Sequence, residues 1–173
     1  MDDEKDNIKV VFLGEIYVGK TSLIEKYVYN KFSDDTPATT KSGFLIKTLE
    51  YKGKKYTFNL WDNSGYESLM PLTKLFISNA NIIVLVYDTT KKNTFLKLQF
   101  WLDFALNILG NDIYIILVGN KGDLYTNREV SEKDGKMFAE TVKAKFDIVT
   151  AKNNYWCIFF ENALKDYIDL KKI

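Results

Sequence analysis

Eight consecutive residues near the start of the chain have the types and spacing of a phosphate-binding loop. The run Gly14-Glu15-Ile16-Tyr17-Val18-Gly19-Lys20-Thr21 fits the pattern G-x-x-x-x-G-K-T. Glycines let a backbone curl so that several N–H groups point at a phosphate chain, and the start of a following helix adds positive charge. We expect Lys20 to reach the outer phosphates of a nucleotide and the Thr21 hydroxyl to ligate Mg²⁺. The residues predicted to contact the nucleotide here are Gly14, Glu15, Tyr17, Val18, Gly19, Lys20, Thr21 and Ser22.

The residues around the loop predict the elements that must position it. Apolar residues 8–13 indicate a buried strand, and apolar residues recur at helical spacing after the loop. We further predict a hairpin (43–51 and 55–61), strands at 82–87, 113–118 and 146–149, and helices within 67–78, 94–109, 131–145 and 154–170. This alternation predicts one α/β domain over residues 1–173, with a mostly parallel six-stranded sheet, one antiparallel strand and helices on both faces. In such sheets ligands bind beyond the carboxyl ends of the strands.

Composition narrows the classes of function. The 173 residues are 46% hydrophobic and 27% charged, and the net charge of +1 gives no field that favours nucleic acid or an anionic membrane. The chain has no histidine, which excludes histidine metal sites and histidine-based triads. The single cysteine, Cys157, allows no intramolecular disulfide, and its apolar neighbours indicate a small buried hydrophobe. The polar, acidic start is not a signal peptide and no apolar run reaches membrane-span length, so we expect a cytoplasmic protein.

A carboxylate follows the second strand of the predicted hairpin. Asp62 comes directly after Trp61, where it could hold Mg²⁺ through a water molecule. Taken alone, an aspartate after a strand is better explained by a turn or a helix cap. Its combination with the phosphate-binding loop favours the magnesium role.

A second polar motif predicts the base. Asn120-Lys121-Gly122-Asp123 follows the apolar run at 113–118 and has the form N-K-x-D. A carboxylate at Asp123 can accept two hydrogen bonds from the ring N–H and amino group of guanine, which adenine does not present in that arrangement. Asn120 can bond the base edge and brace the loops, and the stem of Lys121 can cover the ring face. A plain polar turn is the alternative.

These motifs together resemble the small GTPases of the Ras superfamily, most of all the Rab family. The resemblance runs from about residue 8 to residue 168 and includes GEIYVGKT, WDNSG, GNKGD and TAK in the family's order. It implies a P-loop NTPase fold, GTP and GDP as ligands, and Mg²⁺ as cofactor.

The resemblance also implies roles for residues outside the loop. Phe32 is expected to stack on the guanine, and Gly65 is the glycine of switch II near the γ-phosphate. Thr39 is expected to ligate Mg²⁺ and touch the γ-phosphate as the switch I threonine, with Thr40 as a close competitor. The last guanine motif corresponds to Thr150-Ala151-Lys152, in which the Ala151 N–H would bond the base oxygen.

Softer features favour the Rab branch. Phe44, Trp61 and Phe76 match the aromatic positions that Rab proteins present to effectors, although core and hairpin packing is an equal explanation for Phe44 and Trp61. For Phe95 and Trp101 plain core packing is favoured. The implied partners are effectors, exchange factors and GTPase-activating proteins that bind the switch regions, and no nucleic acid. The last residues carry no prenylation cysteine, so peripheral attachment to vesicle membranes is expected only through a lipidated tail outside this chain.

Three departures from the family bear on hydrolysis. Tyr66 stands where a glutamine usually orients the attacking water, and a phenol cannot imitate the paired donor and acceptor of an amide. Ile16 takes a loop position that is usually small, so it should crowd the γ-phosphate and any arginine finger. The usual T-I-G of switch I is Thr39-Thr40-Lys41, which puts familiar effectors in doubt. The one arginine, Arg128, follows the guanine motif and should lie on the base side.

Three functions follow from these observations. The first is a molecular switch whose catalytic set is Lys20, Thr39, Gly65 and Tyr66, with tight nucleotide binding and very slow hydrolysis. The second is a GTP-locked scaffold that effectors recognise. The third is a P-loop kinase of a small metabolite, which is disfavoured because such enzymes use several arginines around the migrating phosphate.

Overall fold

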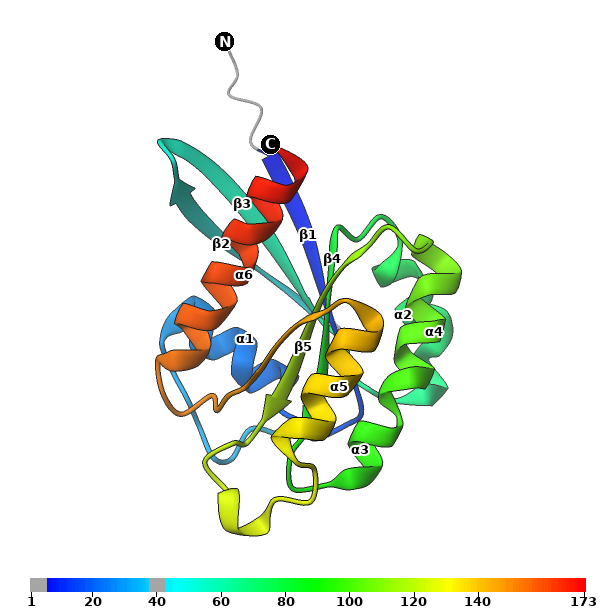
Figure 1. Cartoon of the computed structure of the whole chain (residues 1–173). Coiled ribbons are helices and arrows are strands. Elements are labelled where there is room, and N and C mark those ends of the chain that lie inside the picture. The colour runs from blue at the N-terminus through cyan, green and yellow to red at the C-terminus, as the bar shows by residue number, and fades with distance from the viewer. Residues whose placement is uncertain (1–5, 38–42) are drawn as a thin grey trace.

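The computed structural model describes residues 6–37 and 43–173, in which helices cover both faces of a six-stranded sheet (Figure 1). The strands are β1 (Asp6–Leu13), β2 (Gly43–Tyr51), β3 (Lys54–Asp62), β4 (Ile82–Asp88), β5 (Tyr114–Asn120) and β6 (Lys145–Ile148). The helices are α1 (Lys20–Tyr29), α2 (Met70–Ile77), α3 (Lys92–Leu96), α4 (Leu98–Leu109), α5 (Glu132–Val142) and α6 (Tyr155–Lys171). Two short 3₁₀ helices, η1 (Glu67–Leu69) and η2 (Tyr125–Asn127), complete the described elements.

The strand order places the predicted polar residues at one edge of the sheet. The order is β2-β3-β1-β4-β5-β6, in which β2 pairs antiparallel with β3 and all other neighbours are parallel. The carboxyl ends of β1, β3, β4 and β5 therefore lie at the same end of the molecule. The predicted hairpin and the predicted mostly parallel six-stranded sheet are confirmed.

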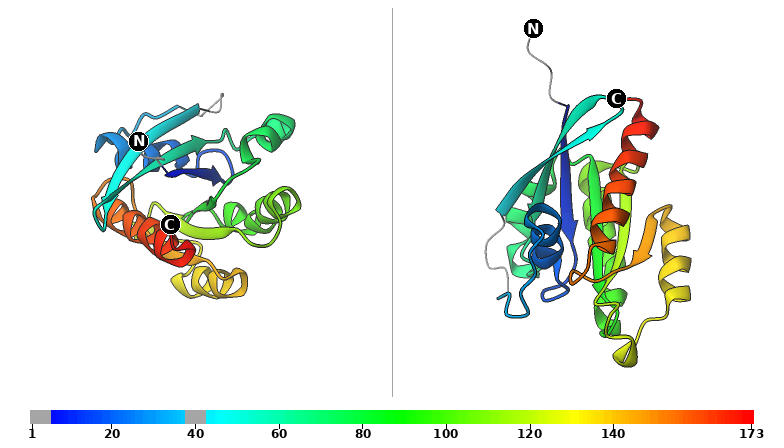
Figure 2. Two further views of the ribbon diagram at one scale, coloured as in Figure 1. Left: turned by 90° about the horizontal axis from the view of Figure 1, so that it is seen from above. Right: turned by 90° about the vertical axis from the view of Figure 1, so that its left-hand side faces the viewer.

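Two hydrophobic cores hold the layers together. Because successive strand residues point to opposite faces, Phe12 of β1 packs with α1 and α6, while its neighbour Val11 packs with the helices of the other face. The second core contains Trp101 of α4, which is fully buried, as predicted. Strand β4 is buried along its whole length because it is covered on both faces, which explains its continuous apolar sequence (Figure 2).

The structure corrects two details of the sequence prediction. The helix predicted over 94–109 is divided into α3 and α4 at Lys97, whose ψ of −8° interrupts the helical geometry. Cys157 was predicted to be buried but is half-buried, because its thiol on α6 faces Lys26 of α1 and donates to the carbonyl of that residue. Burial raises the pKa of the Cys157 thiol, so it has little thiolate character. Within the described residues, no helix is long and apolar enough to cross a membrane.

Candidate nucleotide site

A cavity of about 310 Å³ opens at the carboxyl end of the sheet and gathers most of the predicted site residues. The predicted residues that line it are Tyr17, Gly19, Lys20, Thr21, Ser22, Phe32, Asn120, Lys121, Asp123, Thr150, Ala151 and Lys152. The lining also includes residues that the sequence did not single out, namely Ser33, Asp34, Thr36, Pro37, Ser64 and Leu124. Thr39 and Thr40 lie outside the described residues.

Four predicted residues lie beside the cavity instead of lining its described part. Val18 is fully buried, and its carbonyl accepts a hydrogen bond from Asn120. The carboxylate of Glu15 turns away to accept a hydrogen bond of 2.8 Å from the indole N–H of Trp101. Gly14 and Gly65 contribute their backbones, which lie close to the ammonium of Lys20.

The loop leads into helix α1 through Gly19, whose backbone is in the left-handed conformation. Gly19 has a φ of 95° and precedes Lys20, the first residue of α1. A Cβ at position 19 would lie 2.3 Å from the amide nitrogen of Asn120, so a side chain here would collide with the guanine motif. The start of α1 is thereby aimed at the cavity, and a helix N-terminus favours an anion.

Lys20 is buried, and its ammonium donates to the carbonyl oxygens of Gly14 and Glu15 at 2.9 and 2.8 Å. Burial lowers the pKa of Lys20 to about 8, against the opposing charges of Asp62 and Glu15. Gly65 approaches the same ammonium so closely that a Cβ there would lie 2.7 Å from it and 2.7 Å from the backbone nitrogen of Ile16. This is a site that a phosphate anion would stabilise, since the buried positive charge needs a counter-charge.

Two oxygen groups of the predicted magnesium site lie together. The hydroxyl of Thr21 donates to the carboxylate of Asp62 at 2.5 Å, which brings the end of β3 to the start of α1. Hard oxygen donors of this kind suit Mg²⁺, which binds proteins through one or two such side chains, substrate phosphates and water. The donor chemistry therefore fits the ion. The third predicted ligand, Thr39, is outside the described residues.

The guanine motif is tied to the phosphate-binding loop. The amide nitrogen of Asn120 donates to the Val18 carbonyl at 2.9 Å, while its buried Oδ1 has no hydrogen-bond partner within the described residues. A buried acceptor without a partner is costly, and a polar ligand atom in the cavity would relieve that cost. The structure thus shows the bracing role expected of Asn120.

Asp123 is held as an ionised acceptor. Burial would raise its pKa, but hydrogen bonds from Thr150 and Lys152 outweigh burial and lower it. The ammonium of Lys152 lies 3.3 Å from the carboxylate and also 5.6 Å from the centre of the Phe32 ring. Phe32 and Asp123 are therefore on the same side of the cavity, linked by one cation. Such a carboxylate can accept two hydrogen bonds at neutral pH.

The one arginine lies where the sequence predicted. Arg128 donates from its guanidinium to the carbonyl of Gly122 at 3.2 Å, inside the guanine motif. It therefore lies against the guanine motif.

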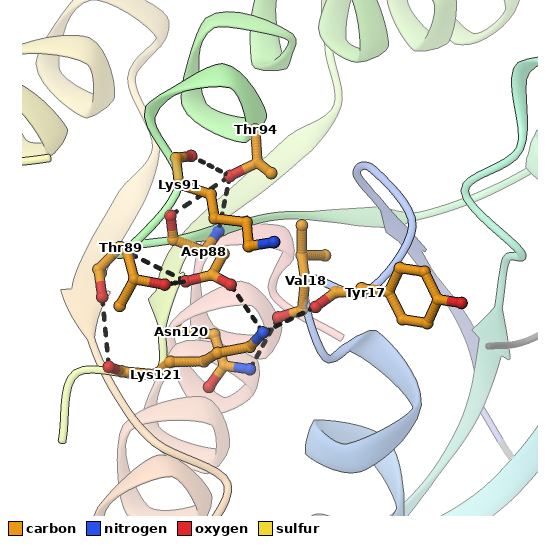
Figure 3. Close-up of polar contacts among 9 residues, drawn as sticks. Tyr17, Val18, Asp88, Thr89, Lys91, Thr94, Asn120 and Lys121 are labelled. Atoms are coloured by element: carbon orange, nitrogen blue, oxygen red, sulfur yellow. Dashed lines mark hydrogen bonds and ion pairs between the residues drawn. The ribbon is translucent and has the colours of Figure 1, made fainter. Parts of the chain in front are cut away.

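Lys121 joins the guanine motif to the phosphate-binding loop (Figure 3). Its ammonium donates to the Tyr17 carbonyl at 2.9 Å and lies 2.6 Å from the carboxylate of Asp88. Asp88 is not among the residues that the sequence predicted for the site. Its contact with Lys121 depends on the parallel pairing of β4 and β5, which sets Asp88 beside Asn120 and which no local pattern reports.

The predicted effector residues form one aromatic patch. Phe44 of β2 stacks on Trp61 of β3 with ring centres 5.1 Å apart, and Phe76 of α2 lies 5.2 Å from Trp61. Phe44 is 52% exposed, while the other two rings are half-buried. The sequence left hairpin packing and surface exposure as alternatives for Phe44 and Trp61. In the structure the three rings pack against one another and still leave Phe44 exposed.

Comparison with known proteins agrees with this geometry. The model of the Ras family matches residues 9–168 of the chain. The chain belongs to the Ras family. The Ras-related protein Rab-21 of Mus musculus and that of Homo sapiens are each 40% identical to this GTPase over 148 residues, which cover 86% of its chain and 67% and 66% of theirs. Rab-12 of Mus musculus is 37% identical over 149 residues, covering 86% of this chain and 61% of that relative.

The GTPase is therefore a Rab-like guanine-nucleotide switch of the Ras superfamily, and it matches about two thirds of the length of these relatives. The two residues expected to slow hydrolysis, Tyr66 and Ile16, lie close together. Tyr66 directly follows Gly65, and the position of a Gly65 Cβ would be 2.7 Å from the backbone nitrogen of Ile16. Both side chains are half-buried.

Proposed function

We propose that this GTPase binds GTP and GDP with Mg²⁺ in the cavity at the carboxyl end of the sheet and hydrolyses GTP very slowly. The observation that carries the proposal is that three kinds of polar group lie at one cavity. The buried ammonium of Lys20 suits a phosphate, the Thr21–Asp62 oxygen pair suits Mg²⁺, and the ionised carboxylate of Asp123 suits guanine.

The roles follow from the groups themselves. The loop N–H groups and Lys20 bind the phosphates, and Asp123 selects guanine by accepting two hydrogen bonds. Thr21, Thr39 and, through water, Asp62 hold the metal, which when bound supplies charge neutralisation at the phosphoryl oxygens. Phe32 and Lys152 cover the base, and the Ala151 N–H bonds the base oxygen. Gly65 brings the switch II backbone to the phosphate end.

Slow hydrolysis is the second part of the proposal. Tyr66 has a single hydroxyl in place of an amide, which can orient the attacking water by donating one hydrogen bond and accepting another. The backbone nitrogen of Ile16 lies 2.7 Å from where a Cβ of Gly65 would stand. We infer that the branched Ile16 side chain takes up room that the γ-phosphate and an arginine finger would need. A finger supplied in trans contributes about 10³–10⁵ in rate to relatives that accept one. Both departures therefore act against the same chemical step.

Single-turnover GTP hydrolysis tests this proposal. We expect a wild-type rate far below that of glutamine-bearing relatives, a measurable gain for Tyr66→Gln, and a larger gain for Tyr66→Gln combined with Ile16→Gly. Tyr125→Gln is the matched control, since Tyr125 is 74% exposed and should leave the rate unchanged. A wild-type rate equal to that of such relatives, or no gain in either variant, would contradict the proposal.

A GTP-locked scaffold is the second candidate, favoured by the same pair of residues. The scaffold and the switch are expected to carry different nucleotides. Chromatography of the nucleotide released from freshly purified protein therefore distinguishes the two functions. GTP favours the scaffold, and GDP favours a switch that turns over or exchanges. Competition by GDP but not by ADP for a bound fluorescent nucleotide argues against the metabolite kinase.

The proposed partners use the switch surface. We assign the aromatic patch of Phe44, Trp61 and Phe76 to effector binding, because Phe44 is exposed and stacks on Trp61, which in turn contacts Phe76. The proposed setting is vesicle trafficking, in the cytoplasm or peripheral to vesicle membranes.

A further inference from the structure

Two residues beside the nucleotide cavity have a backbone conformation that side chains disfavour. Tyr17 in the phosphate-binding loop has a φ of 64°, and Lys121 in the guanine motif has a φ of 62°. Neither is glycine, and left-handed backbone of this kind persists only where the surroundings enforce it. One hydrogen bond joins the two residues, from the Lys121 ammonium to the Tyr17 carbonyl at 2.9 Å.

The ammonium of Lys121 is in turn fixed by Asp88. The Asp88 side chain is 1% exposed, and its Oδ2 lies 2.6 Å from the Lys121 nitrogen. Its other oxygen accepts from the backbone N–H and the hydroxyl of Thr90 at 2.9 and 2.6 Å. Its own backbone N–H donates to the hydroxyl of Thr94 at 2.9 Å (Figure 3). The carboxylate is therefore held on both oxygens at the end of β4.

The guanine motif is attached to the same strand end. The Thr89 N–H donates to the Asn120 carbonyl at 3.1 Å, and the Thr89 hydroxyl donates to the Lys121 carbonyl at 3.3 Å. The contacts of Thr89 thus fix the backbone of Lys121, and Asp88 fixes the ammonium at the end of its side chain. A buried carboxylate has no favourable state without its cation, so the pair restricts Lys121 to one position.

We propose that Asp88 is a positioning residue that sets how long the protein retains its guanine nucleotide. By holding the Lys121 ammonium against the Tyr17 carbonyl, Asp88 keeps the phosphate-binding loop in its strained turn and keeps the Lys121 stem across the base side of the cavity. Loss of the pair releases both loops at once and speeds nucleotide dissociation. This inference rests on the proposed binding of guanine nucleotide in the cavity.

The test is a double-mutant cycle on the dissociation rate of a fluorescent GDP, chased with excess GDP in the presence of Mg²⁺. Asp88→Asn and Lys121→Met are each expected to raise the rate about tenfold or more, because each removes the clamp. The double variant is expected to match Lys121→Met alone within about twofold. Rates that multiply in the double variant would show that Asp88 does not act through Lys121, and would overturn the inference.

Thr90→Val keeps the test decisive if Asp88→Asn does not fold. It leaves the carboxylate in place but removes a hydroxyl that holds it, so we expect a rise of a few-fold that is absent in the Lys121→Met background. Asp103→Asn, a change of the same chemistry on the exposed face of α4, is expected to leave the rate unchanged. An unchanged rate in Thr90→Val, or a rise that persists without the Lys121 ammonium, contradicts the inference.

The outcomes separate this inference from the proposed function. Wild-type protein that does not retain the fluorescent GDP refutes guanine-nucleotide binding itself. Wild-type protein that retains it, with an Asp88→Asn rate equal to wild type, refutes only the role of Asp88. A purely structural role for Asp88 would lower the melting temperature of the GDP-saturated protein without the non-additive rates.

Discussion

Lys20 carries its positive charge into a buried position, where burial lowers its pKa to about 8. Below that pH the folded and unfolded states are both protonated, so the cost of burying the ammonium is fully present. Between about pH 8 and the ordinary value of 10.5, only the unfolded state holds the proton, so stability rises with pH in this window. A phosphate ligand would repay this cost at neutral pH.

Lys20→Met tests the buried charge in nucleotide-free protein. We expect the variant to be more stable than wild type by about 3 kcal/mol at pH 7, because it keeps the stem and removes the charge. The gain should shrink as pH rises toward 10. Urea unfolding at both pH values measures it, and with saturating GDP the order should reverse. A difference that does not change with pH would refute the proposed cost.

Fixed spacing explains which site residues the sequence could predict. The loop and N-K-x-D are local patterns whose chemistry is readable from neighbouring residues. Asp88 was missed because its partner, Lys121, is distant in sequence and meets it only through strand pairing. The hydrogen bond from Trp101 to Glu15 was missed for the same reason.

At the scale of elements, α6 holds α1 in the position that aims the phosphate-binding loop. The indole N–H of Trp156 donates to the carbonyl of Leu23 at 2.7 Å, in a fully buried setting. Its ring stacks on Phe160 with centres 4.6 Å apart, and Phe12 of β1 packs edge-on against both. The three elements thus share one aromatic cluster beneath the start of α1.

Trp156→Ala should therefore destabilise the protein by about 3–5 kcal/mol, through a cavity and the loss of a buried hydrogen bond. Ile158→Ala on the same helix is the control, because Ile158 is 59% exposed and should change stability by no more than about 0.5 kcal/mol. Denaturant unfolding at saturating GDP measures both. Equal losses for the two variants would show that the aromatic cluster is not what holds α6.

Hydrophobic pattern predicted most elements correctly, and its failures have local causes. The apolar runs of β4 and β5 and the capped start of α5 were clear, since Ser131 accepts from the N–H of Asp134 as its sequence indicated. The break at Lys97 carries no glycine or proline, so nothing in the sequence marks it. The order of strands across the sheet depends on tertiary packing, which no local pattern reports.

The two ends of the sheet carry different features. The carboxyl ends of the strands carry the cavity, while the turn between β2 and β3 meets the end of α6 at the other end (Figure 2). There the Tyr51 hydroxyl donates to Asp169 at 2.9 Å, and Lys52 pairs with the same carboxylate at 2.6 Å. Trp61 and Phe76 stand on β3 and α2, the elements on either side of the short segment after Asp62 that begins at the cavity end of the sheet.

Calorimetric titration of wild type and Asp123→Ala with GDP and ATP tests the central claim most directly, with Asp112→Ala as an exposed control. We predict tight binding of GDP by wild type and the control, a loss of at least about 2 kcal/mol in Asp123→Ala, and no comparable binding of ATP by any of them. Unchanged GDP affinity in Asp123→Ala, or ATP bound as tightly as GDP, would contradict the account.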